Sequence, residues 1–401
     1  MDNQELNTHF IKVIGHRNPD TDSVCSAIAY SRLKNTLDPE HPCKPCRAGL
    51  LNRETEFVLN YFQVPDPQLY TDVSPQIRDV DIRRMEGVDG EMSLRRAWIT
   101  MRDQQIDTLC VVDKERNLKG LITVKDVATA NMDVLDTYIL AESETSYQNI
   151  VDILDAKVLV GDITGKKVEG RIVIGSGSAE QMERSISKGD IVIVANRSES
   201  QLTAIEMGAG CVVVCAGCKV SRTICMLAEE QGCMIISTPN STYVSGQMIS
   251  QAAPIRHYMV RDDLLTFNLN SSVESATKVM ASVRFRYFPV LDDDGHYIGV
   301  VSRRNMMNLH KKQLILVDHN EKGQAVEGID QAEILEIIDH HRIGSMETDG
   351  PVYFRNVPVG CTCTIIYQMY RENGVELDRS TAGLLLSAIL SDTLMFRSPT
   401  C

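Results

Sequence analysis

The sequence predicts an α/β protein whose parallel-sheet domain is split by a large insertion, and three observations support this. From Phe10 the chain has the pattern of a strand, a polar loop and a helix, which opens a parallel α/β unit. The same pattern returns after about residue 312. Between these parts, residues 69–312 contain two copies of one short unit on either side of another alternating strand–helix pattern.

The composition excludes several classes of protein. With 401 residues the chain is long enough for two or three domains, and 43% hydrophobic with 24% charged residues is typical of a globular protein. The net charge of −13 argues against a general nucleic-acid binder but allows an anionic substrate where metal ions reverse the sign locally. No apolar stretch reaches the roughly 18 residues of a membrane span, and the N-terminus has no signal-peptide pattern. We therefore expect a cytoplasmic protein with neither nucleic acid nor membrane as a partner.

The twelve cysteines are expected to be reduced thiols, because nothing in the sequence indicates secretion. Two CxxC pairs, Cys43/Cys46 and Cys215/Cys218, are compatible with structural zinc. We favour an interpretation without metal, in which Cys215 and Cys218 end a buried strand while Cys43 and Cys46 flank Pro45 in a loop.

The split domain has recognisable elements on both sides of the insertion. Its first part predicts a strand at Phe10–Ile14, a helix from about Ser23 and a second helix at ETEFVLNYF. In its second part, KKQLILVDHNE and AEILEIIDHHRIG are predicted strands, and STAGLLLSAILSDTLMF is a predicted apolar helix.

The repeated unit appears when the sequence is slid on itself by 179 residues without a gap. MRDQQIDTLCVVDKERNLKGLITVKDVATA, from Met101, then matches MASVRFRYFPVLDDDGHYIGVVSRRNMMNL, from Met280. Each copy predicts helix, strand, turn, strand and helix. Since neither copy buries its apolar face alone, we expect the two to pack on each other.

A separate α/β module is predicted between the two copies, over about residues 135–250. RIVIGSG, DIVIVAN, GCVVVCAG and CMIISTP have the apolar character of buried parallel strands. Helical stretches separate them.

Polar residues follow the apolar elements of the split domain at their ends. In a parallel sheet the carboxyl ends of the strands meet at one crevice, so these groups are expected to converge. Four carboxylates there would repel one another unless about two divalent ions neutralised them. Imidazole with carboxylate favours Mn²⁺, Co²⁺, Fe²⁺ or Zn²⁺ over Mg²⁺ alone. The residues are His16, Asp20, Asp22, Asp318, His319, Asn320, Asp339, His340, His341 and Asp392.

Each of these residues also has a simpler explanation. Asp22 is suited to cap a helix that starts at Ser23. His319 is suited to a solvated loop, and Asp392 to a polar helix end. For any single residue the simpler explanation is as good as a role as metal ligand. The joint occurrence of all these residues at the ends of buried elements nevertheless favours a metal site.

The motifs GHRNPDTDS, VDHNE, DHHRIG and SDT together resemble the DHH superfamily. The Pro-Asp-Thr-Asp-Ser form, with GLLNRETEFVL and PVGCTCTIIY, is similar to the manganese-dependent family II pyrophosphatases. The repeats resemble paired CBS domains, and the module between them resembles a DRTGG domain. The resemblance implies DHH residues 1–68 and 313–401, CBS domains at 69–134 and 253–312, and a DRTGG-like domain at 135–252.

The resemblance implies hydrolysis of inorganic diphosphate to two phosphates, with two Mn²⁺ or Co²⁺ ions and Mg²⁺ accompanying the substrate. His341 would face the substrate as a proton donor, and Asp339 would orient the histidines. One ion would bind His16 and Asp20, the other Asp22, His340 and Asp392, and Asp318 would bridge both.

The CBS resemblance implies a homodimer regulated by adenine nucleotides, with AMP or ADP inhibiting and ATP or diadenosine polyphosphates activating. Nucleotide contacts are expected from Thr123 and Asp126 in the first copy and from Ser302 and Asn305 in the second. The asparagine departs from the usual acid, which argues against two equivalent sites. Arg286 and Tyr287 are further candidates; for Tyr287 and Phe288, packing within a strand is an equal alternative.

The family continues with a DHHA2 domain, whose Ser-Arg-Lys motif and a further lysine bind the diphosphate, and no such motif precedes Cys401. Because these cations would stabilise the transferring phosphoryl group, we expect poor turnover, and a truncated gene model or a fragment is the simplest interpretation. Two alternatives stay open. One is a nucleotide sensor with an impaired catalytic half, and the other is a DHH phosphodiesterase, against which Asp-Thr-Asp-Ser argues.

Overall fold

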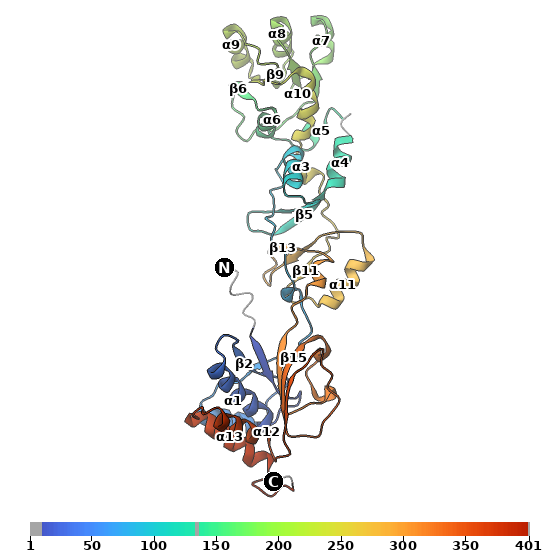
Figure 1. Cartoon of the computed structure of the whole chain (residues 1–401). Helices are drawn as coiled ribbons and strands as arrows, with labels where there is room; N and C mark the ends of the chain where they lie inside the picture. The colour runs from blue at the N-terminus through green and yellow to red at the C-terminus, as the bar shows by residue number, and fades with distance from the viewer. Residues whose placement is uncertain (1–9, 133–135, 400–401) are drawn as a thin grey trace. The chain divides into compact units, whose positions relative to one another are not determined.

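The computed structural model describes residues 10–132 and 136–399. Their contacts divide the chain into two compact units (Figure 1). The first unit comprises the described residues up to Ile82, Phe267–Arg286, and those from Val301 onward. The second comprises Arg83–Thr266 and Tyr287–Val300. The finer domain boundaries given above remain predictions.

The first unit is built on a six-stranded sheet, as the sequence predicts. Every strand pairing in this sheet is parallel, and β1 lies directly beside β14 although about 300 residues separate them. The strand order is β16 (Tyr353–Asn356), β15 (Glu333–Asp339), β14 (Gln313–Val317), β1 (Ile11–Ile14), β2 (Cys43–Arg47) and β3 (Gln68–Leu69).

One face of this sheet packs against helices. Apolar residues of β1 and β14 share a core with α1, α2, α12 and α13, and Figure 1 shows α1, α12 and α13 lying together beside the strands. The other face carries a second core, which includes the short 3₁₀ helix η6 (Ile329–Gln331). The helices span Thr21–Leu37 (α1), Arg53–Phe62 (α2), Thr362–Glu372 (α12) and Arg379–Asp392 (α13).

The loop predicted for Cys43 and Cys46 is wrong, because both residues belong to strand β2. The parallel ladder with β1 supplies backbone partners across Pro45, and both cysteines are buried. Being three residues apart in a strand, they point to opposite faces of the sheet and join different cores. They therefore cannot bind one metal ion together.

The first repeat has the predicted order: α3 (Leu94–Asp103), β4 (Thr108–Val112), β5 (Leu118–Thr123) and α4 (Val124–Met132). The second has α11 (Val273–Ser282), β12 (Phe288–Leu291) and β13 (Tyr297–Val301), but its last predicted helix is only the 3₁₀ turn η4 (Asn305–Met307). The chain leaves helical geometry there because Leu309 already pairs with Val80 as a bridge.

The copies contact each other as expected within the second unit. Cys110 of β4, with Tyr287, Tyr297 and Val300, forms one buried cluster. The backbone N–H of Tyr297 also donates to the carbonyl of Arg116, and the guanidinium group of Arg116 donates to the carbonyl of Tyr297.

The central module is a five-stranded sheet in the order β6–β10–β9–β8–β7. The four predicted strands are parallel, whereas β6 (Lys157–Val160) pairs antiparallel with β10 and was not predicted. The strands are β7 (Ile172–Ile174), β8 (Ile191–Val194), β9 (Cys211–Val214) and β10 (Met234–Ser237), and the helices are α5 (Ile139–Glu142), α6 (Tyr147–Leu154), α7 (Ala179–Ser185), α8 (Ser198–Glu206), α9 (Arg222–Gln231) and α10 (Thr242–Ile249).

The remaining elements are short. They are η1 (Ile77–Asp79), η2 (Ser250–Ala252), η3 (Ile255–His257), β11 (Phe267–Asn268) and η5 (Lys322–Gln324). Within the described ranges, none of the helices combines the length and the apolar character that crossing a bilayer requires.

The close contact of α13 with α2 gives a stability prediction. A Cβ at Gly383 would lie 2.1 Å from Cε1 of Phe62, so Gly383→Ala should force the two helices apart. We expect the free energy of unfolding to fall by about 1–3 kcal/mol, as for other overpacked cores. Gly323→Ala is the control, since no atom lies within 4 Å of its Cβ position. Equal urea midpoints for both variants would contradict this packing argument.

Candidate metal centre

The candidate site lies where the strand order of the first sheet reverses. β1 and β14 are neighbours there, and the chain runs outward from each in opposite directions across the sheet. Ligands of open parallel sheets bind at this switch point, outside the carboxyl ends of the strands. His16 follows β1 and Asp318 follows β14, so both residues stand at this edge.

The first cluster joins His16, Asp20 and Asp318. His16 Nε2 lies 3.6 Å from Oδ2 of Asp20 and 3.5 Å from Oδ2 of Asp318. Asp318 is buried and has a φ of 63°, a left-handed conformation that aspartate tolerates better than most residues. Its ligand atoms and those of the other two residues all lie within 4.8 Å of one another.

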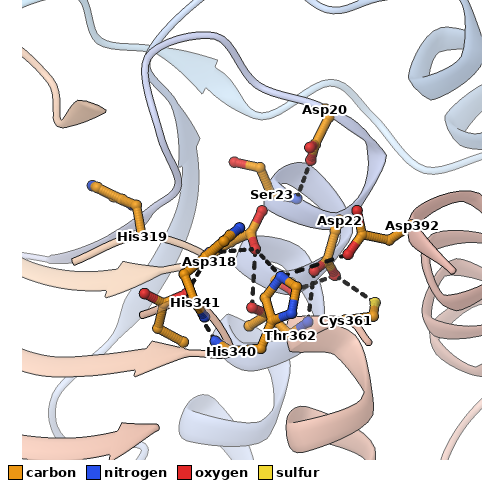
Figure 2. Close-up of polar contacts among 12 residues, drawn as sticks. Asp20, Asp22, Ser23, Asp318, His319, His340, His341, Cys361, Thr362 and Asp392 are labelled. Carbon is orange, nitrogen blue, oxygen red and sulfur yellow. Dashed lines mark hydrogen bonds and ion pairs between the residues drawn. The ribbon is translucent and has the colours of Figure 1, made fainter. Parts of the chain in front are cut away.

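The second cluster joins Asp22, His340 and Asp392, and it meets the first at Asp318. His340 Nε2 lies 3.5 Å from Oδ1 of Asp318 and 3.5 Å from Oδ2 of Asp392 (Figure 2). Nδ1 of His340 donates to the carbonyl of Val359 at 2.9 Å, which directs Nε2 toward the carboxylates. Asp318 therefore lies within ion-pair distance of one histidine from each cluster.

Asp22 is not the cap of α1, which excludes its simpler explanation. The helix begins at Thr21, and Asp20 is its N-cap, accepting from the Ser23 amide at 2.9 Å. Asp22 instead is buried and held from the opposite side of the site. It accepts from the amides of Thr362 at 2.6 Å and Cys363 at 2.9 Å, and from the thiol of Cys361 at 3.0 Å.

The start of α12 was part of a motif that the sequence analysis quoted but gave no role. Besides holding Asp22, Thr362 donates its hydroxyl to Oδ1 of Asp318 at 3.0 Å. Two carboxylates, one from each side of the insertion, are thus fixed by one helix N-terminus.

Asp339 orients both histidines of the Asp-His-His motif. It is fully buried and accepts from the amides of His340 at 2.8 Å and His341 at 3.2 Å. Nδ1 of His341 donates to the same oxygen at 2.8 Å, while the His341 side chain is half-exposed. Asn320 in turn donates to Asp339 and to the carbonyl of Arg342, a positioning role that the sequence did not reveal.

The solvated loop considered for His319 is wrong. Its side chain is 1% exposed, and Nδ1 lies 3.0 Å from the carbonyl of Val317. Its ring packs edge-on against His16, and Figure 2 shows it directed away from Asp392 and Asp22. His319 thus packs beside the site without being part of either cluster.

The pKa values of the site residues reflect burial and the close approach of several carboxylates. Burial, followed by the charge of Asp318, raises the pKa of Asp22 to about 7. Burial opposes protonation of His16 and His340. Interaction with Asp20 and Asp318 nevertheless raises the pKa of His16 to about 10, and interaction with Asp318 and the carbonyl of Val359 raises that of His340 to about 9. Burial also raises the pKa of Asp392.

The donor set fits a pair of divalent ions. Four carboxylates and two imidazoles converge, and within residues 10–132 and 136–399 no lysine or arginine forms an ion pair with any of the four carboxylates. Oxygen and imidazole ligands suit Mn²⁺, Co²⁺ and similar ions. Divalent ions would neutralise these carboxylates while sparing the buried ligands from protonation.

The residues predicted to contact nucleotide form two similar local pairs. Thr123 donates its hydroxyl to Asp126 at 2.7 Å, and Ser302 donates to Asn305 at 2.5 Å. Tyr287 is 9% exposed and its hydroxyl accepts from Arg83 at 3.1 Å, which agrees with the packing alternative, and Phe288 is fully buried. Arg286 is exposed. Their contacts with nucleotide remain predictions.

Comparison with known proteins agrees with this geometry. Residues 10–389 match the DHH family, N-terminal domain. A cobalt-dependent inorganic pyrophosphatase of Clostridium perfringens is 38% identical over 391 residues, covering 98% of this chain and 71% of the relative. The chain belongs to the DHH-family inorganic pyrophosphatases.

Two further relatives extend the comparison. A probable manganese-dependent inorganic pyrophosphatase of Thermotoga maritima is 34% identical, with 97% of this chain and 71% of the relative covered. The CBS and DRTGG domains of the regulatory region of Clostridium perfringens pyrophosphatase, solved with the activator diadenosine tetraphosphate, match with a TM-score of 0.55 and 29% identity. That match covers 57% of this chain and 99% of the solved one, so the predicted fold class and the CBS–DRTGG insertion of this DHH-family chain are confirmed.

The raised histidine pKa values predict that metal binding depends on pH. At pH 7 His16 and His340 both hold protons in the metal-free site, because their pKa values are about 10 and about 9. A metal ion must displace these protons, so the apparent Mn²⁺ affinity should rise steadily from pH 6 to about pH 9. Calorimetry in buffers of different ionisation enthalpy should detect proton release. A pH-independent affinity would contradict the proposed imidazole ligands.

Proposed function

We propose that this chain hydrolyses inorganic diphosphate to two phosphates with a pair of Mn²⁺ or Co²⁺ ions, and Mg²⁺ accompanying the substrate. The observation that carries the proposal is the convergence of two three-residue clusters on the single carboxylate of Asp318. A shared carboxylate is the arrangement expected of two-metal phosphoryl-transfer sites. The names of the most similar relatives agree with this substrate.

In this proposal each cluster binds one ion. His16 and Asp20 hold the first, and Asp22, His340 and Asp392 hold the second, with Asp318 shared between them. When bound, the ions supply charge neutralisation and lower the pKa of a water nucleophile. The chain itself fixes the ligands through the N-terminus of α12 and the carbonyl of Val359.

His341 is the proposed proton donor to the oxygen that bridges the two phosphorus atoms. Asp339 accepts from its Nδ1, which leaves Nε2 to face the substrate. The same hydrogen bond raises the pKa of His341, which favours the protonated imidazolium form. A donor held in this way is ready to protonate a leaving phosphate as the P–O bond breaks.

Regulation by adenine nucleotides is proposed for the inserted repeats. The structural relative was solved with diadenosine tetraphosphate, described there as an activator. In this chain the Thr123–Asp126 and Ser302–Asn305 pairs are the proposed ribose contacts, with Arg286 and Tyr287 nearby in sequence. We further propose a homodimer in the cytoplasm, with AMP or ADP inhibiting and ATP or diadenosine polyphosphates activating.

Substitution of the shared ligand tests the two-ion arrangement. Asp318→Asn keeps the size and tolerates the left-handed backbone, but it removes the charge common to both clusters. We expect both manganese sites to weaken by at least about a hundredfold, beyond the loss typical of outer partners. Asp392→Asn is the matched control and should retain one tight site. Equilibrium dialysis with metal analysis that finds two tightly bound ions in Asp318→Asn would exclude a shared ligand.

An activity assay tests the reaction itself. Phosphate release from diphosphate should require Mn²⁺ or Co²⁺ with Mg²⁺ and should fall when AMP is added. Nucleotide binding without hydrolysis would favour the sensor, and cleavage of dinucleotides but not diphosphate would favour the phosphodiesterase.

A further inference from the structure

A large cavity lies at the end of the first sheet opposite the metal centre. Its volume is about 900 Å³, and it opens beside the amino-terminal ends of β1 and β14, whereas His16 and Asp318 follow their carboxyl ends. Residues 68–79, where the chain leaves the sheet, and residues 309–313, where it returns, both line the cavity. Its polar lining includes Lys12, Arg78, Asp79, Lys311, Lys312 and Glu333.

Lys12 is the unusual residue of this cavity. It lies on β1, is only 8% exposed, and is the register partner of Lys44 on β2, so two ammonium side chains leave neighbouring strands on the same face. Like charges directly opposite in a sheet destabilise it, and burying a cation adds a desolvation cost. Burial and the nearby Lys312 and Lys44 accordingly lower the pKa of Lys12.

Aromatic rings and the negative charge of Asp79 offset this positive charge only in part. Nζ of Lys12 and Nζ of Lys44 each lie 4.3 Å from the ring centroid of Phe10, and Lys12 lies 5.1 Å from that of Tyr70. In the part of the chain that the structure describes, no carboxylate comes within ion-pair distance of Lys12 or Lys44. Among the described residues the buried ammonium group of Lys12 therefore lacks an ion-pair partner, and an anion bound in the cavity would supply one.

The carboxylates that line the cavity are already engaged. Asp79 pairs with Lys312 at 3.3 Å, and Lys312 also donates to the carbonyl of Ser74 at 2.9 Å. Glu333 accepts from Gln313 at 3.0 Å. The four cationic side chains of the lining outnumber these two carboxylates, so the cavity is electropositive in a protein whose net charge is −13.

We propose that this cavity is a second anion site, which binds a phosphoryl group through Lys12, with Arg78 and Lys312 as further donors. Phosphate offers several charged oxygens, and clustered ammonium and guanidinium groups bind it through short charge-assisted hydrogen bonds. The group is either inorganic phosphate or the phosphate of a small phosphorylated molecule, which the volume admits. Bound there, it ties the segments where the chain leaves and re-enters the sheet to β1.

Lys12→Met tests the site, because it removes the charged amino group and keeps most of the length of the side chain. In chloride the variant should melt at a higher temperature than the unaltered chain, since a desolvated cation and its repulsion with Lys44 are gone. Inorganic phosphate at matched ionic strength should raise the melting temperature of the unaltered chain clearly and that of the variant little. Calorimetry on the manganese-loaded chain should show a phosphate dissociation constant about tenfold or more weaker in the variant.

Lys278→Met is the matched control, because it removes the same charge from an exposed helix position on α11. It leaves the metal centre and the cavity untouched and should respond to phosphate like the unaltered chain. Arg78→Met removes a second proposed phosphate donor of the cavity and should also weaken the binding of phosphate. Weakening of AMP but not of inorganic phosphate would identify a nucleotide as the source of the phosphoryl group. An identical response of Lys12→Met, Arg78→Met and Lys278→Met to both probes would overturn the proposal.

Discussion

Crowding of negative charge at one edge of a parallel sheet is the constraint on which the rest of the first unit depends. Asp20, Asp22, Asp318 and Asp392 converge there, and in the described ranges only histidines form ion pairs with them. Repulsion between carboxylates is strong where water is excluded. The raised pKa of Asp22 indicates that protonation relieves this repulsion in part, and bound divalent ions would balance the negative charge without protonating the ligands.

The ligands stay in place because other groups hold them. Asp22 accepts from two backbone amides at the start of α12, and Asp339 accepts from the amides of both His340 and His341. Such hydrogen bonds limit the rotation of each carboxylate and aim the imidazoles. The Cys361–Cys363 segment, whose side chains and amides contact Asp22, therefore serves the metal centre although it contributes none of its proposed ligands.

The strand order explains how a chain with so long an insertion builds one site. β14 returns to the sheet beside β1, so ligands from both sides of the insertion meet at the switch point. The returning segment leads directly into β14, which carries Asp318 at its end. The opposite ends of the same two strands border the basic cavity around Lys12.

The sequence by itself determined the parallel α/β class, the two repeats and the set of polar residues at the ends of apolar elements. These follow from local rules, since strand alternation and the convergence of carboxyl ends hold for any parallel sheet. Local rules failed where long-range pairing decided the outcome. β1 turns the proline-containing segment Cys43–Arg47 into a strand, and packing against His16 buries His319. Only the tertiary structure showed that Asp20 caps α1 while α12 holds Asp22, because the partners of a side chain depend on which distant element the sheet order brings beside it.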